Sequence, residues 1–270
     1  MSMKFEIKEA ICTKCGQCVK DCPMGILEMK DGRPGVRAGK EGGCMACQHC
    51  VAVCPQGAVT LNGVGADDCT PLDEMPIPPP TEVANLIRSR RSVRQFTRTN
   101  IPRADILDLL ETLKYVPTGC NAMDLTFTVV DDIAKMDELR TRVLDILVSK
   151  LDTLPDFLKG ATIAAQKHPG TDPFFRNAPH ILIVSGDPKS VTPQTDCDAA
   201  IAYFDMLAQS AGLGTTWCGF LHIIVDAVPE VADVFGIPRG APFYAMIFGE
   251  PVVDYSRCVN RSGAAQIKFL

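Results

Sequence analysis

The chain has 270 residues, of which 46% are hydrophobic and 22% are charged, proportions typical of a globular protein long enough for two domains. Its net charge of -5 gives no reason to expect a nucleic-acid partner. The first ten residues are mixed and charged, and no apolar run reaches the length of a membrane span. We therefore expect no signal peptide, no transmembrane helix and a cytoplasmic location.

Two copies of one cysteine pattern occupy residues 1–62. Each reads C-x2-C-x2-C-x3-C-P, and the second begins 32 residues after the first (44 − 12 = 32): the members are Cys12, Cys15, Cys18 and Cys22, then Cys44, Cys47, Cys50 and Cys54. This spacing is typical of the ligands of two [4Fe-4S] clusters. Structural zinc is the alternative, although zinc usually takes its thiolates from two separated C-x2-C pairs. The repeat predicts two related half-modules.

The cysteine module resembles bacterial two-cluster ferredoxins over its full length. That resemblance implies crossed ligation, in which Cys54 completes the first set of three cysteines and Cys22 completes the second. A module this small is expected to depend on its clusters for folding. We interpret His49 as a surface residue, and a role in tuning a cluster or docking a donor is the alternative.

Five cysteines lie outside the two motifs. The odd total and the absence of an export signal argue against a disulfide framework. Cys69 is interpreted as a bystander, and Cys120 and Cys218 as small buried residues. Cys197 and Cys258 have no assigned role.

Residues 63–80 have the composition of a linker between the module at 1–62 and a second domain at 81–270. The stretch is rich in proline and acidic residues and ends in three consecutive prolines. Such a run favours a stiff, extended polyproline II conformation.

The second domain alternates helical and extended patterns. We predict helices at 82–90, with Thr81 as N-cap, from Pro102, at 133–151 and at 198–211. Strands are predicted at 127–130, 181–184, 215–218, 243–248 and 266–270. The pattern indicates an α+β domain in which helices flank a central sheet.

Two short segments of this domain carry chemistry. Arg90, Arg91, Ser92 and Arg94 follow the first helix, and guanidinium groups beside a hydroxyl are suited to binding phosphate. A solvated basic turn is the alternative for this run alone. Pro117, Thr118, Gly119 and Asn121 form a polar loop, which by itself predicts only a turn.

The order of these segments resembles the FMN-dependent nitroreductase family, and its ferredoxin-fused branch also matches the cysteine module. The likeness extends to DPFFRNAP at 172–179, GLGTTWCGF at 212–220, FGEP at 248–251 and a basic C-terminal segment. Glu250 stands where the family usually has tyrosine. The implied fold is a two-[4Fe-4S] ferredoxin-like domain followed by an α/β/α layered nitroreductase-like domain.

The resemblance implies roles at FMN. Arg90, Arg91 and Ser92 would bind its phosphate or ribityl groups, and Arg94 would approach the pyrimidine end, where a cation stabilises the reduced ring. Arg257 or Arg261 would close on the phosphate.

The remaining implied contacts involve the flavin ring and a second subunit. Trp217, Cys218 and Gly219 would lie along the isoalloxazine. The loop residues Pro117, Thr118, Gly119 and Asn121 would reach the neighbour's flavin, because family members are homodimers with sites at the interface. Residues 266–270 would add a strand to the partner's sheet.

These features together predict an FMN-dependent oxidoreductase that receives electrons through two [4Fe-4S] clusters. It would reduce an electron-poor small molecule such as a nitroaromatic or quinone, with the chemistry on the flavin and no catalytic side chain identified. The donor is a low-potential carrier or NAD(P)H. An electron carrier or redox-sensing module without turnover is the alternative, and relatives of this fold also dehalogenate, oxidise rings or cleave flavin.

Four aromatic residues have two interpretations. Phe157, Phe174 and Phe175 are interpreted as core residues, with a substrate lid as the alternative. Trp217 is interpreted as a packing residue rather than a platform for substrate.

Overall fold

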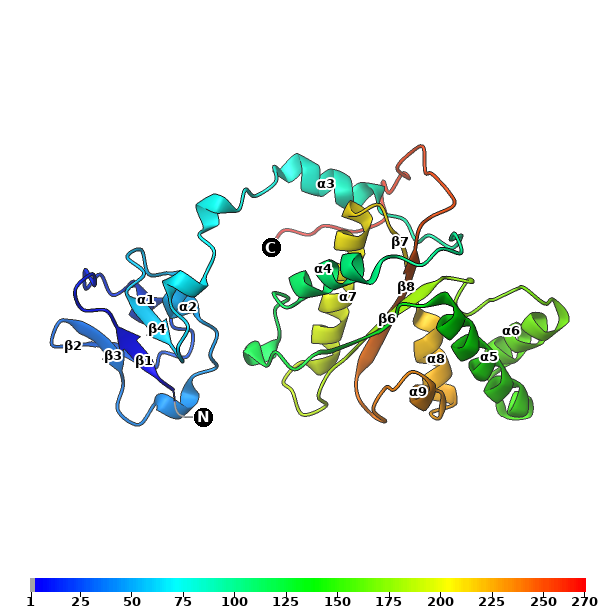
Figure 1. The fold of residues 1–270 in the computed structure, drawn as a ribbon, viewed down its shortest axis with the longest axis horizontal. Helices are drawn as coiled ribbons and strands as arrows, with labels where there is room; N and C mark the ends of the chain where they lie inside the picture. Colours follow the sequence, from blue (N-terminus) through cyan, green and yellow to red (C-terminus); the bar gives the residue numbers. More distant parts are fainter. Residues whose placement is uncertain (1–2) are drawn as a thin grey trace. The chain divides into compact units, whose positions relative to one another are not determined.

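The computed structural model describes residues 3–270 and divides into two compact units (Figure 1). The first consists of the chain up to Pro78 together with Cys120–Ala122, and the second of Pro79–Gly119 and Met123–Leu270. Among the described residues, no helix has the length and apolar character needed to cross a membrane.

The first unit is built from two short sheets and two short helices. Strand β1 (Phe5–Ile7) pairs with β4 (Val59–Leu61), and β2 (Leu27–Lys30) pairs with β3 (Arg33–Val36), both antiparallel. Helices α1 (Gln17–Lys20) and α2 (His49–Ala52) occupy equivalent places in the two halves. The residue before each helix has a left-handed backbone, with φ 72° at Gly16 and φ 60° at Gln48. The sequence repeat is therefore also a repeat of backbone conformation.

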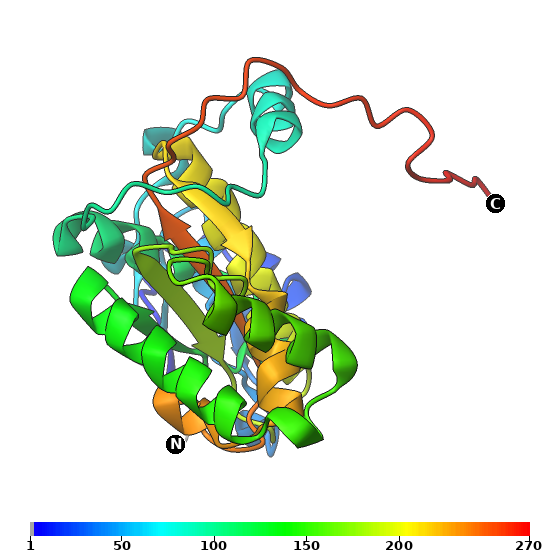
Figure 2. The ribbon, with the colours of Figure 1, turned by 90° about the vertical axis from the view of Figure 1, so that its right-hand side faces the viewer.

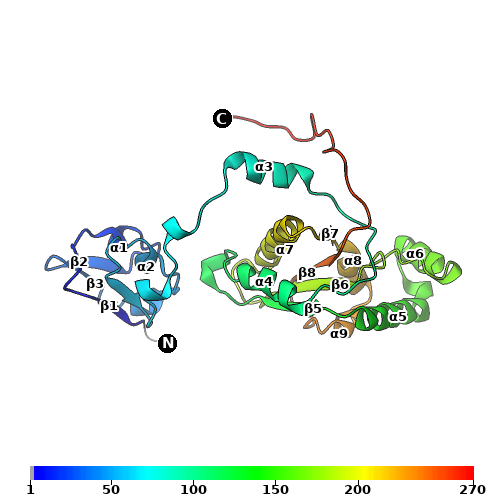
Figure 3. The same cartoon turned by 45° about the horizontal axis from the view of Figure 1, so that its top comes forward.

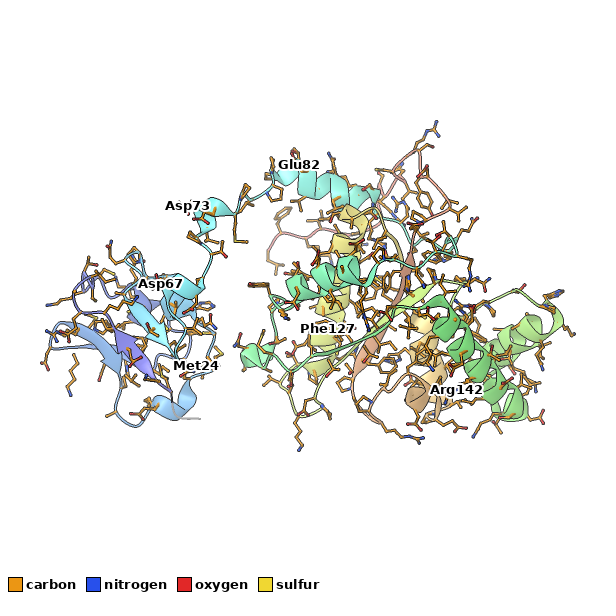
Figure 4. The ribbon with its side chains drawn as sticks, viewed as in Figure 1. Met24, Asp67, Asp73, Glu82, Phe127 and Arg142 are labelled. Carbon is orange, nitrogen blue, oxygen red and sulfur yellow. The ribbon has the colours of Figure 1, made fainter. Side chains whose placement is uncertain are left out.

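The chain leaves the first unit through exposed residues that contain two 3-10 turns, Ala66–Asp68 and Leu72–Glu74. Asp67, at the surface of the unit (Figure 4), lies 3.1 Å from the Lys8 ammonium. Helix α3 (Pro80–Ser89) then begins. The predicted cap at Thr81 is wrong, because Pro80 takes the first helical position, where its fixed φ is compatible with a helix and its missing N–H costs nothing.

The second unit contains a four-stranded antiparallel sheet in the order β5-β6-β8-β7. The strands are β5 (Thr126–Val130), β6 (His180–Ser185), β7 (Gly214–Trp217) and β8 (Phe243–Gly249). Every residue of β6 is buried, as its unbroken apolar run predicts. Four of the predicted strands are confirmed.

The fifth predicted strand, at 266–270, is absent from the described chain. Residues 254–270 are exposed and irregular, and Figure 2 shows this tail extending away from the sheet. A strand needs a neighbouring strand to satisfy its backbone groups, and the tail meets none within this chain.

Helices cover both faces of the sheet (Figure 1, Figure 3). On one face, α4 (Arg103–Leu113) and α7 (Pro193–Ser210) pack over Leu182, Val184, Met246 and Phe248. The other face carries α5 (Ile133–Ser149), α6 (Asp156–Lys167), α8 (Gly219–Ala227) and α9 (Val231–Val234). Successive strand residues point to opposite faces, so β6 and β8 supply both cores. This arrangement confirms the predicted layered α+β fold.

His180 fastens the start of β6 to two neighbouring segments. Its Nε2 accepts a hydrogen bond from the Ile101 amide at 3.0 Å, and Nδ1 lies 3.3 Å from the Val130 carbonyl oxygen. The imidazole is therefore neutral, with its proton on Nδ1. Burial lowers the pKa of His180 below its ordinary value.

Candidate functional site

Eight cysteines surround two cavities of the first unit, each of about 320 Å³. We call Cys12, Cys15, Cys18 and Cys54 the first cysteine set, and Cys22, Cys44, Cys47 and Cys50 the second cysteine set; each set lines one cavity. The fold thus brings together the same groups of four that crossed ligation requires. Within residues 3–270, no three potential ligands come close enough to hold a single ion.

The thiols of these sets have different environments. Burial raises the pKa of Cys50 to about 11 and also raises the pKa of Cys18. A hydrogen bond from the Gln17 amide lowers the pKa of the exposed Cys15. The Ala58 amide donates to the Cys54 sulfur at 3.2 Å. Buried thiolates are stable only beside positive charge or hydrogen-bond donors, which is what iron and these amides supply.

In the second unit, residues 90–94 lie beside strand β7, and we call them the arginine segment. The Val93 amide donates to the Thr215 carbonyl at 2.8 Å, and the Thr216 hydroxyl donates to the Val93 carbonyl. A Cβ atom on Gly214 would lie 2.7 Å from a methyl group of Val93. Only glycine allows this close approach, so Ser92 and its neighbours are held at a fixed place along the sheet.

A buried carboxylate on α7 connects the arginine segment to Trp217. Asp205 is 4% exposed, and its Oδ2 lies 3.1 Å from Arg90 Nη1 and accepts a hydrogen bond from Trp217 Nε1 at 3.0 Å. The Thr215 hydroxyl donates to Oδ1. Two predicted cofactor-binding residues are therefore held by one acid. The sequence gives no signal for it, because a single aspartate in a helical pattern is ordinary.

The guanidinium groups of this segment retain free donors. Among the described residues, Arg90 Nη1 is within ion-pair distance of Asp205 but makes no hydrogen bond of acceptable geometry, and Arg91 Nε is buried without a hydrogen-bond partner. Arg91 Nη2 and Arg94 Nη1 donate to nearby backbone carbonyls. Half-buried donors without acceptors are costly unless an acceptor binds. This favours an anion site over a solvated basic turn.

A second buried carboxylate on α7 holds the predicted polar loop. The Gly119 amide donates to both oxygens of Asp196, at 3.0 and 3.1 Å, and the Thr192 hydroxyl donates to the same side chain at 2.9 Å. A Cβ atom on Gly119 would overlap that hydroxyl. Asn121 groups with the first unit, where its amide donates to the Met45 carbonyl at 3.0 Å.

The loop corrects one prediction. Cys120 is exposed rather than buried, with φ 52° in a 3-10 turn. Pro117 and Thr118 precede this turn, and the Thr118 hydroxyl accepts a hydrogen bond from the Met123 amide at 3.0 Å.

Residues 217–219 join β7 to α8. The Trp217 ring packs edge-on against Tyr244, with centroids 5.1 Å apart, which agrees with a packing role. Cys218 is 3% exposed, and burial raises its pKa to about 12, so it is a buried, unreactive thiol. Gly219 begins α8.

The aromatic residues near α8 separate into two groups. Phe174 and Phe175 are buried core residues, which confirms their interpretation as packing. Phe157 is 60% exposed and stacks on Phe220 with centroids 5.3 Å apart, so it does not belong to the core.

The two C-terminal arginines lie in the exposed tail. The only side-chain hydrogen bond that Arg257 makes within the described chain is to Ser256. Neither Arg257 nor Arg261 is joined to the arginine segment in this chain. The structure therefore does not bring these two predicted phosphate ligands to the others.

Comparison with known proteins identifies both parts of the chain. Residues 87–250 match the Nitroreductase family, and residues 11–59 match the 4Fe-4S dicluster domain. YfhC of Bacillus subtilis (strain 168), named as an NAD(P)H nitroreductase, is 29% identical over 168 residues, which cover 60% of this chain and 80% of YfhC. Iodotyrosine deiodinase of Thermotoga neapolitana is 22% identical over 134 residues, 48% of this chain and 70% of that protein.

The fold comparison agrees with the sequence comparison. The crystal structure of a nitroreductase with bound FMN from Bacteroides fragilis superposes with a TM-score of 0.58 and 27% identity, covering 70% of this chain and 99% of that one. The family match spans more than half of the sequence. The chain therefore belongs to the nitroreductase family, as a flavin-dependent oxidoreductase with an N-terminal 4Fe-4S dicluster domain.

Proposed function

We propose that this protein receives electrons through two [4Fe-4S] clusters and uses FMN to reduce an electron-poor small molecule, such as a nitroaromatic or a quinone. One observation carries the proposal: a single chain holds two crossed sets of four cysteines and a nitroreductase-family domain with unsatisfied arginine donors. Clusters that transfer one electron at a time can supply the two electrons that FMN holds.

The first and second cysteine sets are the proposed cluster ligands. Each set surrounds a cavity rather than a point, as a four-iron cubane requires and a mononuclear zinc site does not. When bound, the clusters supply one-electron transfer. The amides that point at cysteine sulfurs would stabilise the reduced state.

The proposed FMN site gathers around the arginine segment and β7. Arg90, Arg91 and Ser92 would hold the phosphate or ribityl chain, because Arg91 Nε is buried without a hydrogen-bond partner among the described residues and Arg90 is oriented by Asp205. Arg94, which is exposed, would face the pyrimidine end, and Trp217, Cys218 and Gly219 would lie along the ring. When bound, FMN supplies two-electron reduction.

A homodimer with flavin sites at the interface is part of the proposal. The exposed tail supports it, since residues 254–270 are exposed and irregular yet include large apolar side chains such as Ile267 and Phe269. In a dimer, Arg257 or Arg261 would complete a phosphate site, and residues 117–121 would reach the neighbour's flavin.

Three further assignments belong to the same proposal. We place the domain division at 1–62, 63–80 and 81–270, and the protein in the cytoplasm. The electron donor is a low-potential carrier protein or NAD(P)H, and the name of YfhC supports the nicotinamide. The deiodinase relative is the observation that favours reductive dehalogenation as a second candidate reaction.

Anaerobic purification and reduction test the proposal. We expect about eight iron atoms per chain, one FMN, and faster substrate reduction with a reduced carrier protein than with nicotinamide. A brown preparation that cannot take up FMN would instead identify an electron carrier without turnover. Fast reduction by nicotinamide in a variant without clusters would refute the internal electron route.

A further inference from the structure

One free lysine lines the cavity of the first cysteine set, and a second lies on the helix that carries one of its cysteines. Lys14 lines the cavity of that set, and Lys20 is the last residue of α1, the helix that bears Cys18. Both lysines are exposed. Throughout residues 3–270, no carboxylate forms an ion pair with either of them, whereas Arg33 at the same rim is neutralised by Glu9 at 2.5 Å.

The internal repeat provides a matched comparison for these lysines. An offset of 32 residues places Ala46 at the position of Lys14 and Ala52 at the position of Lys20. The backbones agree, with φ 59° at Lys14 and 52° at Ala46, and both Lys20 and Ala52 end four-residue helices. The charge difference is therefore a property of the side chains alone.

The second cysteine set has an apolar rim. Its cavity is lined by no lysine, arginine or carboxylate, and by methionines that include Met24, which is 51% exposed (Figure 4). His49 belongs to this lining but lies 3.2 Å from Asp21. No lysine or arginine lines this cavity itself, and the exposed Arg37 near it donates from Nε to the carbonyl of Leu27 at 3.3 Å.

The first cysteine set also has the more exposed cysteine at one matched position of the repeat. Cys15 of the first set is exposed, whereas Cys47, its counterpart in the second set, is half-buried. A redox protein approaches a cluster most closely where a ligand reaches the surface. The free lysines and the exposed ligand thus coincide.

The charge of the whole chain reinforces this local pattern. Residues 1–62 contain eight lysines and arginines against six acids, a net charge of +2, and the remaining 19 against 26 leave -7 in residues 63–270. Residues 1–62 therefore attract an acidic protein, whereas residues 63–270 as a whole repel one. Long-range fields of this kind set the encounter rate of electron-transfer partners.

We propose that Lys14 and Lys20 form a docking surface beside the first cysteine set for an acidic one-electron carrier protein, whose own redox group is an iron–sulfur centre or a flavin. The proposal rests on the proposed function, because it names the donor of that reaction. Each encounter oxidises the carrier by one electron and reduces this chain by one, so two encounters supply the two electrons that the substrate takes up with protons from water.

Binding of an oxidised, acidic ferredoxin to the full-length holoprotein tests the surface without any turnover. We expect the double variant Lys14→Gln/Lys20→Gln to weaken binding roughly 2- to 30-fold at low salt, since exposed pairs contribute about 0.2–1 kcal/mol each. The salt dependence of the dissociation constant should also become shallower. An acidic flavodoxin in a parallel arm identifies which redox group the carrier bears.

Two controls keep the charge change and the position separate. Arg142→Gln/Lys159→Gln removes the same charge from the second unit, where Arg142 projects from α5 (Figure 4), and should leave binding unchanged. Ala52→Glu adds an acid at the matched position of the second set and should have far less effect than Lys20→Glu. Visible absorbance of the clusters and the FMN content show that each variant is intact.

Three outcomes overturn the docking surface: no binding of either acidic carrier, unchanged affinity in the lysine variant, or an equal loss in the Arg142→Gln/Lys159→Gln control. The proposed function fails separately, if the protein lacks flavin or clusters, or if dithionite-reduced protein reduces no nitroaromatic or quinone.

Discussion

The carboxylate of Asp205 should contribute both to the stability of the second unit and to its affinity for FMN. Replacement by asparagine keeps the shape and removes the charge. The buried oxygen atoms accept hydrogen bonds from Trp217 and Thr215 and lie beside Arg90. An asparagine amide must turn its NH2 group either toward Trp217 and Arg90, where the bonds are lost, or toward Thr215, where the hydroxyl must accept instead of donate. In either orientation the remaining bonds lose the charged acceptor.

The expected loss in unfolding free energy is about 2–4 kcal/mol. Hydrogen bonds to a charged acceptor contribute roughly 1.5–3 kcal/mol and those to a neutral one about 1, and Asp205→Asn weakens two. The pairing with Arg90 adds about 1 kcal/mol or less, because that side chain is 29% exposed and partly screened. FMN affinity should fall about tenfold, since Arg90 loses the group that orients it.

Fluorescence during denaturant unfolding measures the stability directly, because Trp217 is the only tryptophan of the chain and belongs to the network. The matched control is Asp198→Asn on the same helix, where the carboxylate accepts from Gln194 at 2.9 Å and is only half-buried; we expect a loss below about 1 kcal/mol.

A double-mutant cycle with Arg90→Met separates the ion pair from simple loss of packing. Coupled residues give a double variant that is less destabilised than the sum by about 1 kcal/mol. Additivity within about 0.5 kcal/mol, together with unchanged FMN binding in Asp205→Asn, would refute the role assigned to the carboxylate.

Three further predictions concern the loop, the buried histidine and the cysteine sets. Gly119→Ala should destabilise the second unit by about 2 kcal/mol and weaken FMN binding, because the added methyl overlaps the Thr192 hydroxyl; unfolding curves that match wild type would contradict this. His180 has a lowered pKa in the folded state, so its contribution is complete above the unfolded pKa near 6.5 and is lost as pH falls toward the folded pKa; the slope of unfolding free energy between pH 7.5 and 5 should flatten in His180→Gln. Cys54→Ser and Cys22→Ser should each remove one cluster, the first and the second respectively, leaving about four iron atoms per chain; loss of the same paramagnetic signal from both variants would exclude crossed ligation.

The sequence predicted those elements whose pattern is complete in one segment. The apolar run at 181–184 lies within β6, and the periodic stretch at 133–151 corresponds to α5. Helix α8 was not predicted, because its nine residues are mostly apolar and only His222 and Asp226 interrupt the run. Periodicity alone cannot distinguish a short apolar run of this kind from a strand.

The sequence misplaced the start of one helix and did not predict another. Helix α7 begins at Pro193 rather than 198, because proline is favoured in the first turn and the apolar period begins only later. Helix α6 (Asp156–Lys167) lies in a stretch for which no helix was predicted. These differences follow from local competition between capping and periodicity rather than from an error in fold class.

The sequence predicted the loops of the candidate site but not the two buried acids of α7 that hold them. Arginine-rich and glycine-containing loops have a recognisable composition, whereas Asp196 and Asp205 are single acids inside a helical pattern. Their meaning depends on partners brought close only by folding: Gly119 for one, and Arg90 with Trp217 for the other. Nine residues separate the two acids, which is about 14 Å along a helix axis. One rigid helix therefore fixes the spacing between two loops that are far apart in the sequence. Any change that tilts or shortens α7 should disturb at once the arginine segment of the chain's own FMN site and the loop proposed to reach the neighbour's flavin.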